Sequence, residues 1–168
     1  DGHSEVLRAL AELGANINTP DNDGCTPAFI AAQKGHLEVV RVLAELGASV
    51  DTPKNNGVTP ACIAAHNGHL EVVTLLAELG ASVETPENNG CTPAWVAAQN
   101  GHTKVIRLLV SLKPALVTTA NNAGWAPLAI SVQQNKLEGT KTLLLLGAPV
   151  TIRDLKQRAN ARSDTRQL

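Results

Sequence analysis

Residues 56–83 read NGVTPACIAAHNGHLEVVTLLAELGASV, and this stretch decides the fold of the chain. Its opening Asn-Gly pair favours a tight turn, because glycine readily adopts the positive backbone φ that such turns need. Thr59 then offers a hydroxyl N-cap, and Pro60 follows at the first helical position, where a missing N–H costs nothing. A short alanine-rich helix is predicted to end at Gly68 in the left-handed conformation. A second helix follows, so the unit is a turn and two antiparallel helices.

Closely similar blocks stand on both sides of this stretch. The turn glycines are Gly24, Gly57, Gly90 and Gly124, spaced 33, 33 and 34 residues apart, and the extra residue lies in KPALV at 113–117. Two short helices cannot bury their apolar faces alone, so stacking of neighbouring blocks supplies the core. We divide the single domain 1–168 into a partial repeat 1–22, full repeats 23–55, 56–88 and 89–122, a degenerate terminal repeat 123–155 and a basic C-terminal tail 156–168.

The shared pattern is G-x-T-P-x-x-x-A-A-x-x-G-H-x-x-V-V-x-x-L-x-x-x-G-A-x-V, and it extends over residues 1–155. This pattern resembles the ankyrin repeat. The resemblance implies an all-α ankyrin-repeat solenoid of stacked helix-turn-helix units with β-turn or hairpin tips. It also implies a concave groove, formed by the tips and first helices, that binds protein partners, and a domain with no catalytic activity of its own.

Both ends of the chain depart from the pattern. The final repeat has Ser131-Val132 in place of the alanine pair, Asn135-Lys136 in place of Gly-His, and Gly139 inside its second helix. We interpret this unit as a degenerate or capping repeat. Residues 1–13 match a second helix whose own first helix is absent, so we expect the natural protein to continue upstream.

Composition and charge limit the class of protein. The longest apolar run, around residues 143–146, is far short of the roughly 20 residues that cross a bilayer, so we expect a soluble, non-transmembrane chain. Residues 1–100 contain four Lys/Arg and twelve Asp/Glu, whereas residues 101–168 contain ten and three. Surface solubility explains much of this asymmetry, but the basic C-terminal end also predicts contact with an acidic protein surface or anionic lipid. Nucleic acid is disfavoured, because only two tryptophans could interleave with the cations.

The histidines favour structural roles. His3, His36, His69 and His102 recur at the repeat period beside a glycine, so we expect each to make a hydrogen bond at the turn between helices. His66 falls outside this series. Together with His69 it spells H-x-x-H, but no third ligand accompanies the pair and no metal site is predicted.

The cysteines give no sign of a disulfide framework or a reactive site. Cys25, Cys62 and Cys91 are an odd number without C-x-x-C spacing, which favours a reducing, intracellular compartment. No nucleophile stands beside an oriented base, and the glycines do not form a phosphate-binding loop. We therefore predict no catalytic residue, no metal, no cofactor and no enzyme activity.

Specificity for a partner is expected to reside in positions that vary between repeats of a constant scaffold. Here these positions are rich in amides and nearly uncharged. The predicted partner-binding residues of the tips are Asn22, Asp23, Cys25, Asn55, Asn56, Val58, Asn88, Asn89, Cys91, Asn122 and Trp125; those of the first helices are Gln33, Lys34, His66, Asn67, Trp95, Gln99, Asn100, Gln133 and Gln134. Trp125 is a candidate anchor, because aromatic residues dominate interface hot spots. Trp95 is predicted to pack between repeats with one edge reaching the groove.

These observations predict a non-catalytic protein-interaction module or scaffold, either a monomeric module or part of a hetero-complex. Two alternatives stay open. One is a structural or linker subunit held in a larger multi-protein assembly, and the other is an ankyrin segment of a longer enzyme or channel.

Overall fold

The computed structural model describes residues 2–151, with side chains described from Ser4 onward. This part of the chain is helical and contains no strand. Its elements are α1 (Gly2–Glu12), α2 (Pro27–Lys34), α3 (Leu37–Glu45), α4 (Pro60–Asn67), α5 (Leu70–Glu78), α6 (Pro93–Asn100), α7 (Thr103–Leu112), the 3₁₀ helix η1 (Pro114–Val117), α8 (Pro127–Gln133) and α9 (Leu137–Leu145). The predicted all-α solenoid is confirmed.

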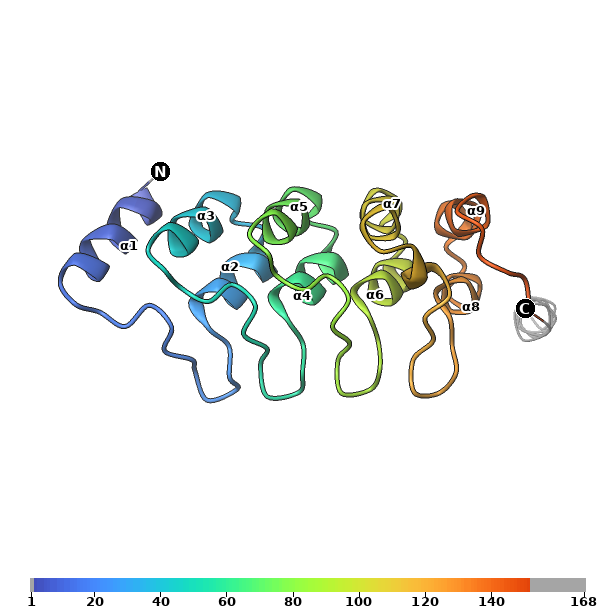
Figure 1. Ribbon diagram of the computed structural model, residues 1–168, viewed down its shortest axis with the longest axis horizontal. Helices are drawn as coiled ribbons and strands as arrows, with labels where there is room; N and C mark the ends of the chain where they lie inside the picture. The colour runs from blue at the N-terminus through green and yellow to red at the C-terminus, as the bar shows by residue number, and fades with distance from the viewer. Residues whose placement is uncertain (1, 152–168) are drawn as a thin grey trace, which may run out of the picture.

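The helices form two layers. The first helices α2, α4, α6 and α8 contact one another in order, and the second helices α1, α3, α5, α7 and α9 do the same. Between the layers, each first helix contacts the second helix that follows it in the chain. The tips project from the first-helix layer, on the side away from the second helices (Figure 1). This arrangement places the tips in one row along an edge of the molecule.

The first helices begin as the sequence predicts. Thr26, Thr59 and Thr92 each accept the backbone N–H three residues later, and a proline follows each threonine at the start of the helix. Gly35, Gly68 and Gly101 end α2, α4 and α6 with φ between 74° and 81°. Because these caps satisfy backbone groups that a helix leaves unpaired at its ends, helices of only eight residues persist in the stack.

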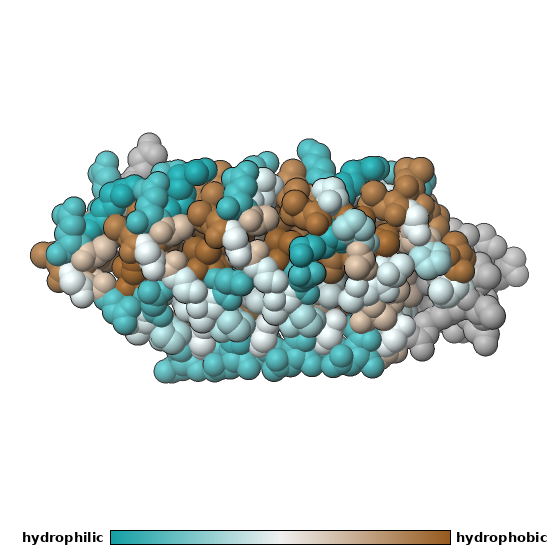
Figure 2. Space-filling model, in the orientation of Figure 1, coloured by the Kyte–Doolittle hydropathy of each residue, from teal (hydrophilic) through white to brown (hydrophobic). Residues whose placement is uncertain are grey.

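The core runs through the whole stack rather than forming a single centre. Its largest fully buried side chains include Phe29, Leu43, Leu76, Ile106 and Leu143, which come from successive repeats. Alanine pairs on the first helices are also buried, so adjacent helices can approach closely. Apolar residues therefore lie between the layers, whereas the row of tips forms a hydrophilic strip along one edge (Figure 2).

The last repeat keeps the architecture with different residues. Ala126 precedes α8 without a side-chain cap, and Asn135 adopts φ 53° where earlier repeats have glycine. Gly139 is buried within α9, and a Cβ there would lie 3.2 Å from Ser131 Oγ. Ser131 Oγ in turn lies 2.9 Å from Thr140 Oγ1. A polar contact and a small residue thus replace the alanine packing of the earlier repeats.

The extra residue of the longer interval is taken up by η1. Helix α7 ends at Leu112 without a left-handed glycine, and Pro114 begins the 3₁₀ turn. Leu116 on this turn is buried at 3% exposure. The insertion therefore still supplies an apolar side chain to the core. In the residues that the structure describes, no helix is both long enough and apolar enough to span a bilayer.

Candidate functional site

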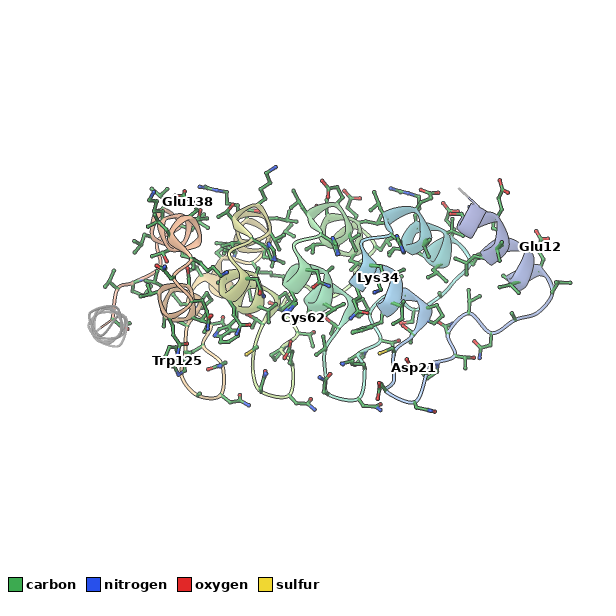
Figure 3. The ribbon with its side chains drawn as sticks, turned by 180° about the vertical axis from the view of Figure 1, so that it is seen from behind. Glu12, Asp21, Lys34, Cys62, Trp125 and Glu138 are labelled. Atoms are coloured by element: carbon green, nitrogen blue, oxygen red, sulfur yellow. The ribbon has the colours of Figure 1, made fainter. Side chains whose placement is uncertain are left out.

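Each tip is a tight turn that its own side chains stabilise. In the first tip, Asp21 Oδ1 accepts the backbone N–H groups of Asp23 and Cys25 at 2.9 and 2.8 Å. In the last tip, Asn121 Oδ1 accepts the N–H groups of Ala123 and Trp125 at 3.1 and 3.0 Å. These bonds hold the turn backbone in one conformation, so the tips present their outer side chains in fixed positions. Asp21 and Trp125 lie at the bases of these two tips (Figure 3).

Backbone hydrogen bonds join each tip to the next. The N–H of Asn55 donates to Asp23 O at 3.1 Å, that of Asn88 to Asn56 O at 3.2 Å, and that of Asn122 to Asn89 O at 3.0 Å. The turn glycine allows this approach: a Cβ on Gly24 would lie 2.5 Å from Asn55 Oδ1 and 2.9 Å from its backbone N. The predicted tip residues therefore form a ladder with a constant spacing between repeats.

Two of the ladder asparagines also use their side chains between tips. Asn55 Nδ2 donates to Asn22 O at 3.2 Å, and Asn122 Nδ2 donates to Asn88 O at 3.1 Å. A primary amide carries two donor hydrogens and an acceptor oxygen, so each side chain keeps capacity for a further partner. These asparagines hold the tips together and remain exposed on the outer edge.

The ends of the first helices form a second polar row. Asn67 Nδ2 donates to Gln33 O at 2.9 Å, which links α4 to α2. Asn100 Nδ2 donates to Val96 O at 2.9 Å and lies 3.3 Å from His66 Nδ1. This row crosses the repeats along the C-terminal ends of the first helices.

Two of the periodic histidines, His69 and His102, make the structural hydrogen bond that their spacing predicts. Nε2 of His69 donates to Gln33 O at 3.1 Å, and Nε2 of His102 donates to the main-chain oxygen of His66 at 2.9 Å. Each ring packs over the glycine of the preceding repeat: a Cβ on Gly35 would lie 2.7 Å from His69 Nδ1. The Gly-His pairs therefore connect successive repeats. The side chain of His3 lies outside the described residues.

The exposure of the predicted binding residues divides them into three groups. Exposed are Asn22, Asp23, Lys34, Asn55, Asn56, His66, Asn67, Asn88, Asn89, Asn122, Gln133 and Gln134. Half-buried are Cys25, Gln33, Gln99, Asn100 and Trp125. Buried are Val58 at 7%, Cys91 at 3% and Trp95 at 8% exposure. The structure thus corrects the sequence-based surface, because these last three side chains lie in the core.

Trp95 illustrates the reason for this correction. It lies on α6, which packs between α4 and α8, and its Nε1–H donates to Trp125 O at 2.8 Å. The next repeat therefore holds the one polar atom of the buried indole. Trp95 fills the seam between repeats, and the predicted exposed edge is nearly absent.

A row of variable residues at the base of the tips was missed by the sequence analysis. The position before the tip asparagine is occupied by Asp21, Lys54, Glu87 and Asn121. Lys54 Nζ lies 5.8 Å from the centre of the Phe29 ring. The sequence signal that could have identified this row is a charge that changes from repeat to repeat at one position, whereas the neighbouring asparagine stays the same. Charges of alternating sign therefore lie beside the uncharged asparagines of the first three tips.

The second helices carry ion pairs on their outer face, both within one helix and between repeats. Glu38 and Arg41 pair at 3.6 Å as their spacing predicts. Arg8, however, bonds to Glu45 of the next repeat at 2.5 Å instead of to Glu12 on its own helix. Both side chains are about half exposed, so this ion pair contributes little to stability.

The thiols offer no reactive centre. Burial raises the pKa of the Cys62 thiol well above its usual range, and Glu87, whose Oε1 accepts from its Sγ at 3.3 Å, raises it further. Burial also raises the pKa of Cys91, and Asn121 partly opposes this effect. Desolvation and the charge of Asp21 raise the pKa of Cys25. Nucleophilic cysteines need a lowered pKa, so these thiols are unsuited to covalent catalysis.

Metal-binding residues do not converge in the part of the chain that the structure describes. No group of three His, Cys, Asp or Glu side chains there is placed to hold an ion. In the H-x-x-H pair, Nε2 of His69 already donates to Gln33 O. The basic tail predicted at 156–168 lies outside the described residues.

Comparison with known proteins agrees with this architecture. A family model described as ankyrin repeats (3 copies) matches residues 1–87 and 81–154. No match was found among curated proteins.

Proposed function

We propose that this chain, which belongs to the ankyrin-repeat family, binds a protein partner through the row of tips and the exposed ends of the first helices. Ankyrin repeats are generally protein–protein interaction modules, and domains of this family are typically non-catalytic. We call this surface the tip face, and it comprises the twelve exposed residues named above.

The observation that carries this proposal is the contrast between a fixed backbone and exposed polar side chains. The tip backbones are tied to one another at 3.0–3.2 Å between N and O. A partner therefore meets a surface that needs little ordering on binding, which lowers the entropic cost of association. Exposed amides on this surface can donate to and accept from a polypeptide backbone or polar side chains.

The charged residues at the bases of the tips favour one register of a bound partner over others. Asp21, Lys54 and Glu87 give the order negative, positive, negative along the first three tips. Alternating charges suppress wrong registers more than they raise affinity. The partner that fits best is a protein segment with polar, largely uncharged side chains and opposite charges at matching intervals.

The test compares two double variants, one on the tip face and one on the outer face of the second helices. Lys34→Glu with His66→Glu changes two exposed residues of the tip face, whereas Glu71→Lys with Glu78→Lys changes two exposed residues of the second helices. The partner is isolated on immobilised wild-type chain, identified by mass spectrometry and titrated against each variant. We expect the tip-face variant to weaken binding by about tenfold or more and the outer-face variant to bind within about twofold of wild type.

Circular dichroism of both variants checks that the helices are retained. Equal loss in the two variants, with the fold intact, would contradict the assignment to the tip face. Unchanged binding by the tip-face variant would contradict it as well.

A further inference from the structure

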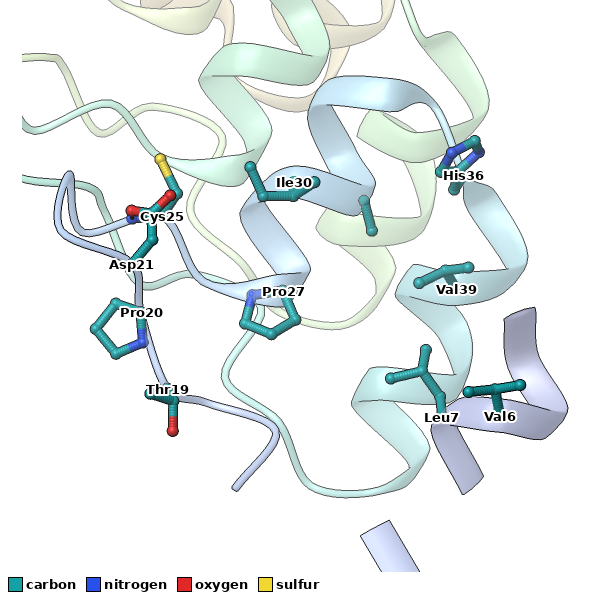
Figure 4. A pocket seen from close by; sticks show the side chains of 11 residues that line it. Val6, Leu7, Thr19, Pro20, Asp21, Cys25, Pro27, Ile30, His36 and Val39 are labelled. Carbon is teal, nitrogen blue, oxygen red and sulfur yellow. Dashed lines mark hydrogen bonds between the residues drawn. The ribbon is translucent and has the colours of Figure 1, made fainter. Parts of the chain in front are cut away.

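The side chains at the bases of the four tips are used in two different ways. In the first and last tips, the base residues Asp21 and Asn121 each accept two N–H groups of their own tip backbone through Oδ1. Figure 4 shows Asp21 turned toward Cys25 of the same tip. These two base side chains therefore serve the turn in which they stand.

In the two middle tips, an asparagine beside the turn glycine takes over this role. Oδ1 of Asn56 and Oδ1 of Asn89 each accept the N–H of the residue that follows the turn glycine, at 3.2 and 2.8 Å. The base residues of these tips are Lys54 and Glu87. Because asparagine oxygens accept the turn N–H groups, the longer side chains of Lys54 and Glu87 can extend away from the turn.

Both of these side chains lie over the first helix of the preceding repeat. Lys54 Nζ lies 5.8 Å from the centre of the Phe29 ring on α2, so the ammonium has a cation–π partner within the chain. Oε1 of Glu87 accepts from Cys62 Sγ on α4 at 3.3 Å, and Oε2 accepts from Asn89 Nδ2 at 3.1 Å. These two donors are uncharged, so they orient the carboxylate without neutralising it.

The Glu87 carboxylate has no compensating cation nearby. Among the residues that the structure describes, no lysine or arginine forms an ion pair with it. Glu87 is half-buried, and Cys62 beneath it is fully buried. A charge at the edge of the core costs free energy unless it is paired, and its attraction to an opposite charge is screened less than in open water. A cation supplied from outside the chain would therefore bind here with an advantage.

We propose that Glu87 determines which partner the tip face binds, by pairing with an arginine side chain of that partner; this inference rests on the proposed function of the tip face. A carboxylate has about four acceptor sites, two on each oxygen. One site on each Glu87 oxygen is taken, and the remaining two match the pair of parallel N–H groups that a guanidinium donates. Arginine is also more weakly hydrated than lysine, which favours it at a half-buried position.

The experiment uses peptides of defined sequence as the probe. Dodecapeptides are selected from a random library on the immobilised chain and kept only if the tip-face variant, Lys34→Glu with His66→Glu, releases them. We expect the retained peptides to contain an arginine. Each is then titrated with that arginine replaced by citrulline, which is uncharged and nearly the same shape, or by lysine. Citrulline should weaken binding to the wild-type chain by about tenfold or more, and lysine should weaken it to a smaller extent.

Glu87→Gln and Glu84→Gln form a matched pair of variants. Both remove one negative charge from the same repeat, but Glu84 already pairs with Lys113 at 3.0 Å. The amide oxygen of Glu87→Gln can still accept from Cys62, so we expect the variant to keep its fold, which thermal unfolding checks. Glu87→Gln should weaken binding of the arginine peptides by about tenfold or more, whereas Glu84→Gln should bind them within about twofold of wild type.

A double-mutant cycle links the two groups. If Glu87 binds the arginine, the citrulline peptides should bind wild type and Glu87→Gln within about twofold of each other, because either change alone removes the contact. Losses that simply add would show that the arginine binds elsewhere and would overturn the proposal. Wild-type affinity of Glu87→Gln for the arginine peptides overturns it as well. Equal binding of arginine, lysine and citrulline peptides to the wild-type chain overturns it without any variant of Glu87.

The outcome for the tip face itself is separate. Peptides that the tip-face variant releases, but that contain no arginine or do not respond to Glu87→Gln, leave binding at the tip face supported and overturn only the arginine contact. A library that yields no peptide sensitive to the tip-face variant contradicts both proposals.

Discussion

Helix α8 begins without the side-chain cap that the other first helices have, and this difference allows a stabilising substitution to be predicted. Ala126 has φ −77° and ψ 162°. Thr92, which caps α6, has φ −82° and ψ 163°, and its Oγ1 accepts the N–H of Trp95 at 3.3 Å. The backbone at Ala126 is therefore already in the capping conformation. Ala126→Thr should supply the missing acceptor for the N–H of Ala129.

The expected gain is about 1 kcal/mol, within the range of roughly 0.5–2 kcal/mol for a threonine cap replacing alanine. For a domain of this length, 1 kcal/mol corresponds to a rise in melting temperature of about 2–4 °C. Terminal repeats can unfold before the rest of a stack, so a global melting curve would dilute the effect. Native-state hydrogen exchange at the Ala129 amide measures it locally, and a gain of 1 kcal/mol slows exchange about fivefold.

Two controls separate the hydroxyl from the added volume. Ala126→Val has nearly the shape of threonine without an acceptor and should leave exchange at Ala129 unprotected. Thr92→Ala removes a cap of the same geometry and should cost about 1 kcal/mol. Equal effects of threonine and valine at Ala126, or a loss of stability with threonine, would refute the argument from equivalent caps.

The remaining predictions concern the seams between repeats. In denaturant unfolding, Gly68→Ala should cost about 1 kcal/mol or more beyond the cost of Gly47→Ala. Both glycines have positive φ, but a Cβ at Gly68 would lie 2.5 Å from the histidine ring of the next repeat, whereas a Cβ at Gly47 would meet nothing within 4 Å. The pKa of the Cys62 thiol is raised in the folded state, so the unfolded chain loses this proton at lower pH. The free energy of unfolding should therefore fall as pH rises above about 8.5, by at most about 1.4 kcal/mol per pH unit. Denaturant unfolding under reducing conditions at pH 7.5 and 9.5 should show a smaller fall in Cys62→Ala than in wild type, and an identical pH dependence would contradict this prediction. Trp95→Phe removes the bond to Trp125 O and should cost about 1–2 kcal/mol in the same assay, with wild-type stability as the refuting result.

Features that depend on one repeat or its periodicity could be predicted from the sequence. The threonine caps, the left-handed glycines and the histidine hydrogen bonds all follow from residues at a constant spacing. The second helix that each block predicts is observed in the first full repeat as Leu37–Glu45, with Leu46 as its C-cap. Local chemistry decides these features, so a single block contains the information.

Features that depend on a neighbouring repeat could not be predicted in the same way. Cys25 and Cys91 occupy one register position, yet Cys25 is half-buried and Cys91 is 3% exposed. Within the described residues, a full repeat packs in front of Cys91 and only one helix, α1, precedes Cys25. The partner of Arg8 shows the same limit, because helical spacing favours Glu12 whereas the structure places Glu45 within 2.5 Å. Burial and ion pairing here are properties of the stack, which a single block does not specify.

The tips show how the stack separates structure from specificity. Asparagine recurs at 22, 55, 88 and 122, where backbone hydrogen bonds join one tip to the next and the side chains of Asn55 and Asn122 add further bonds. Its repetition follows from a structural role that every repeat shares. The preceding position changes from aspartate to lysine to glutamate to asparagine while the turn backbone stays constant. Because the ladder keeps its spacing whichever residue stands there, that position can change in charge without moving its neighbours. Recognition of one partner over another should therefore depend more on these variable bases than on the asparagines beside them.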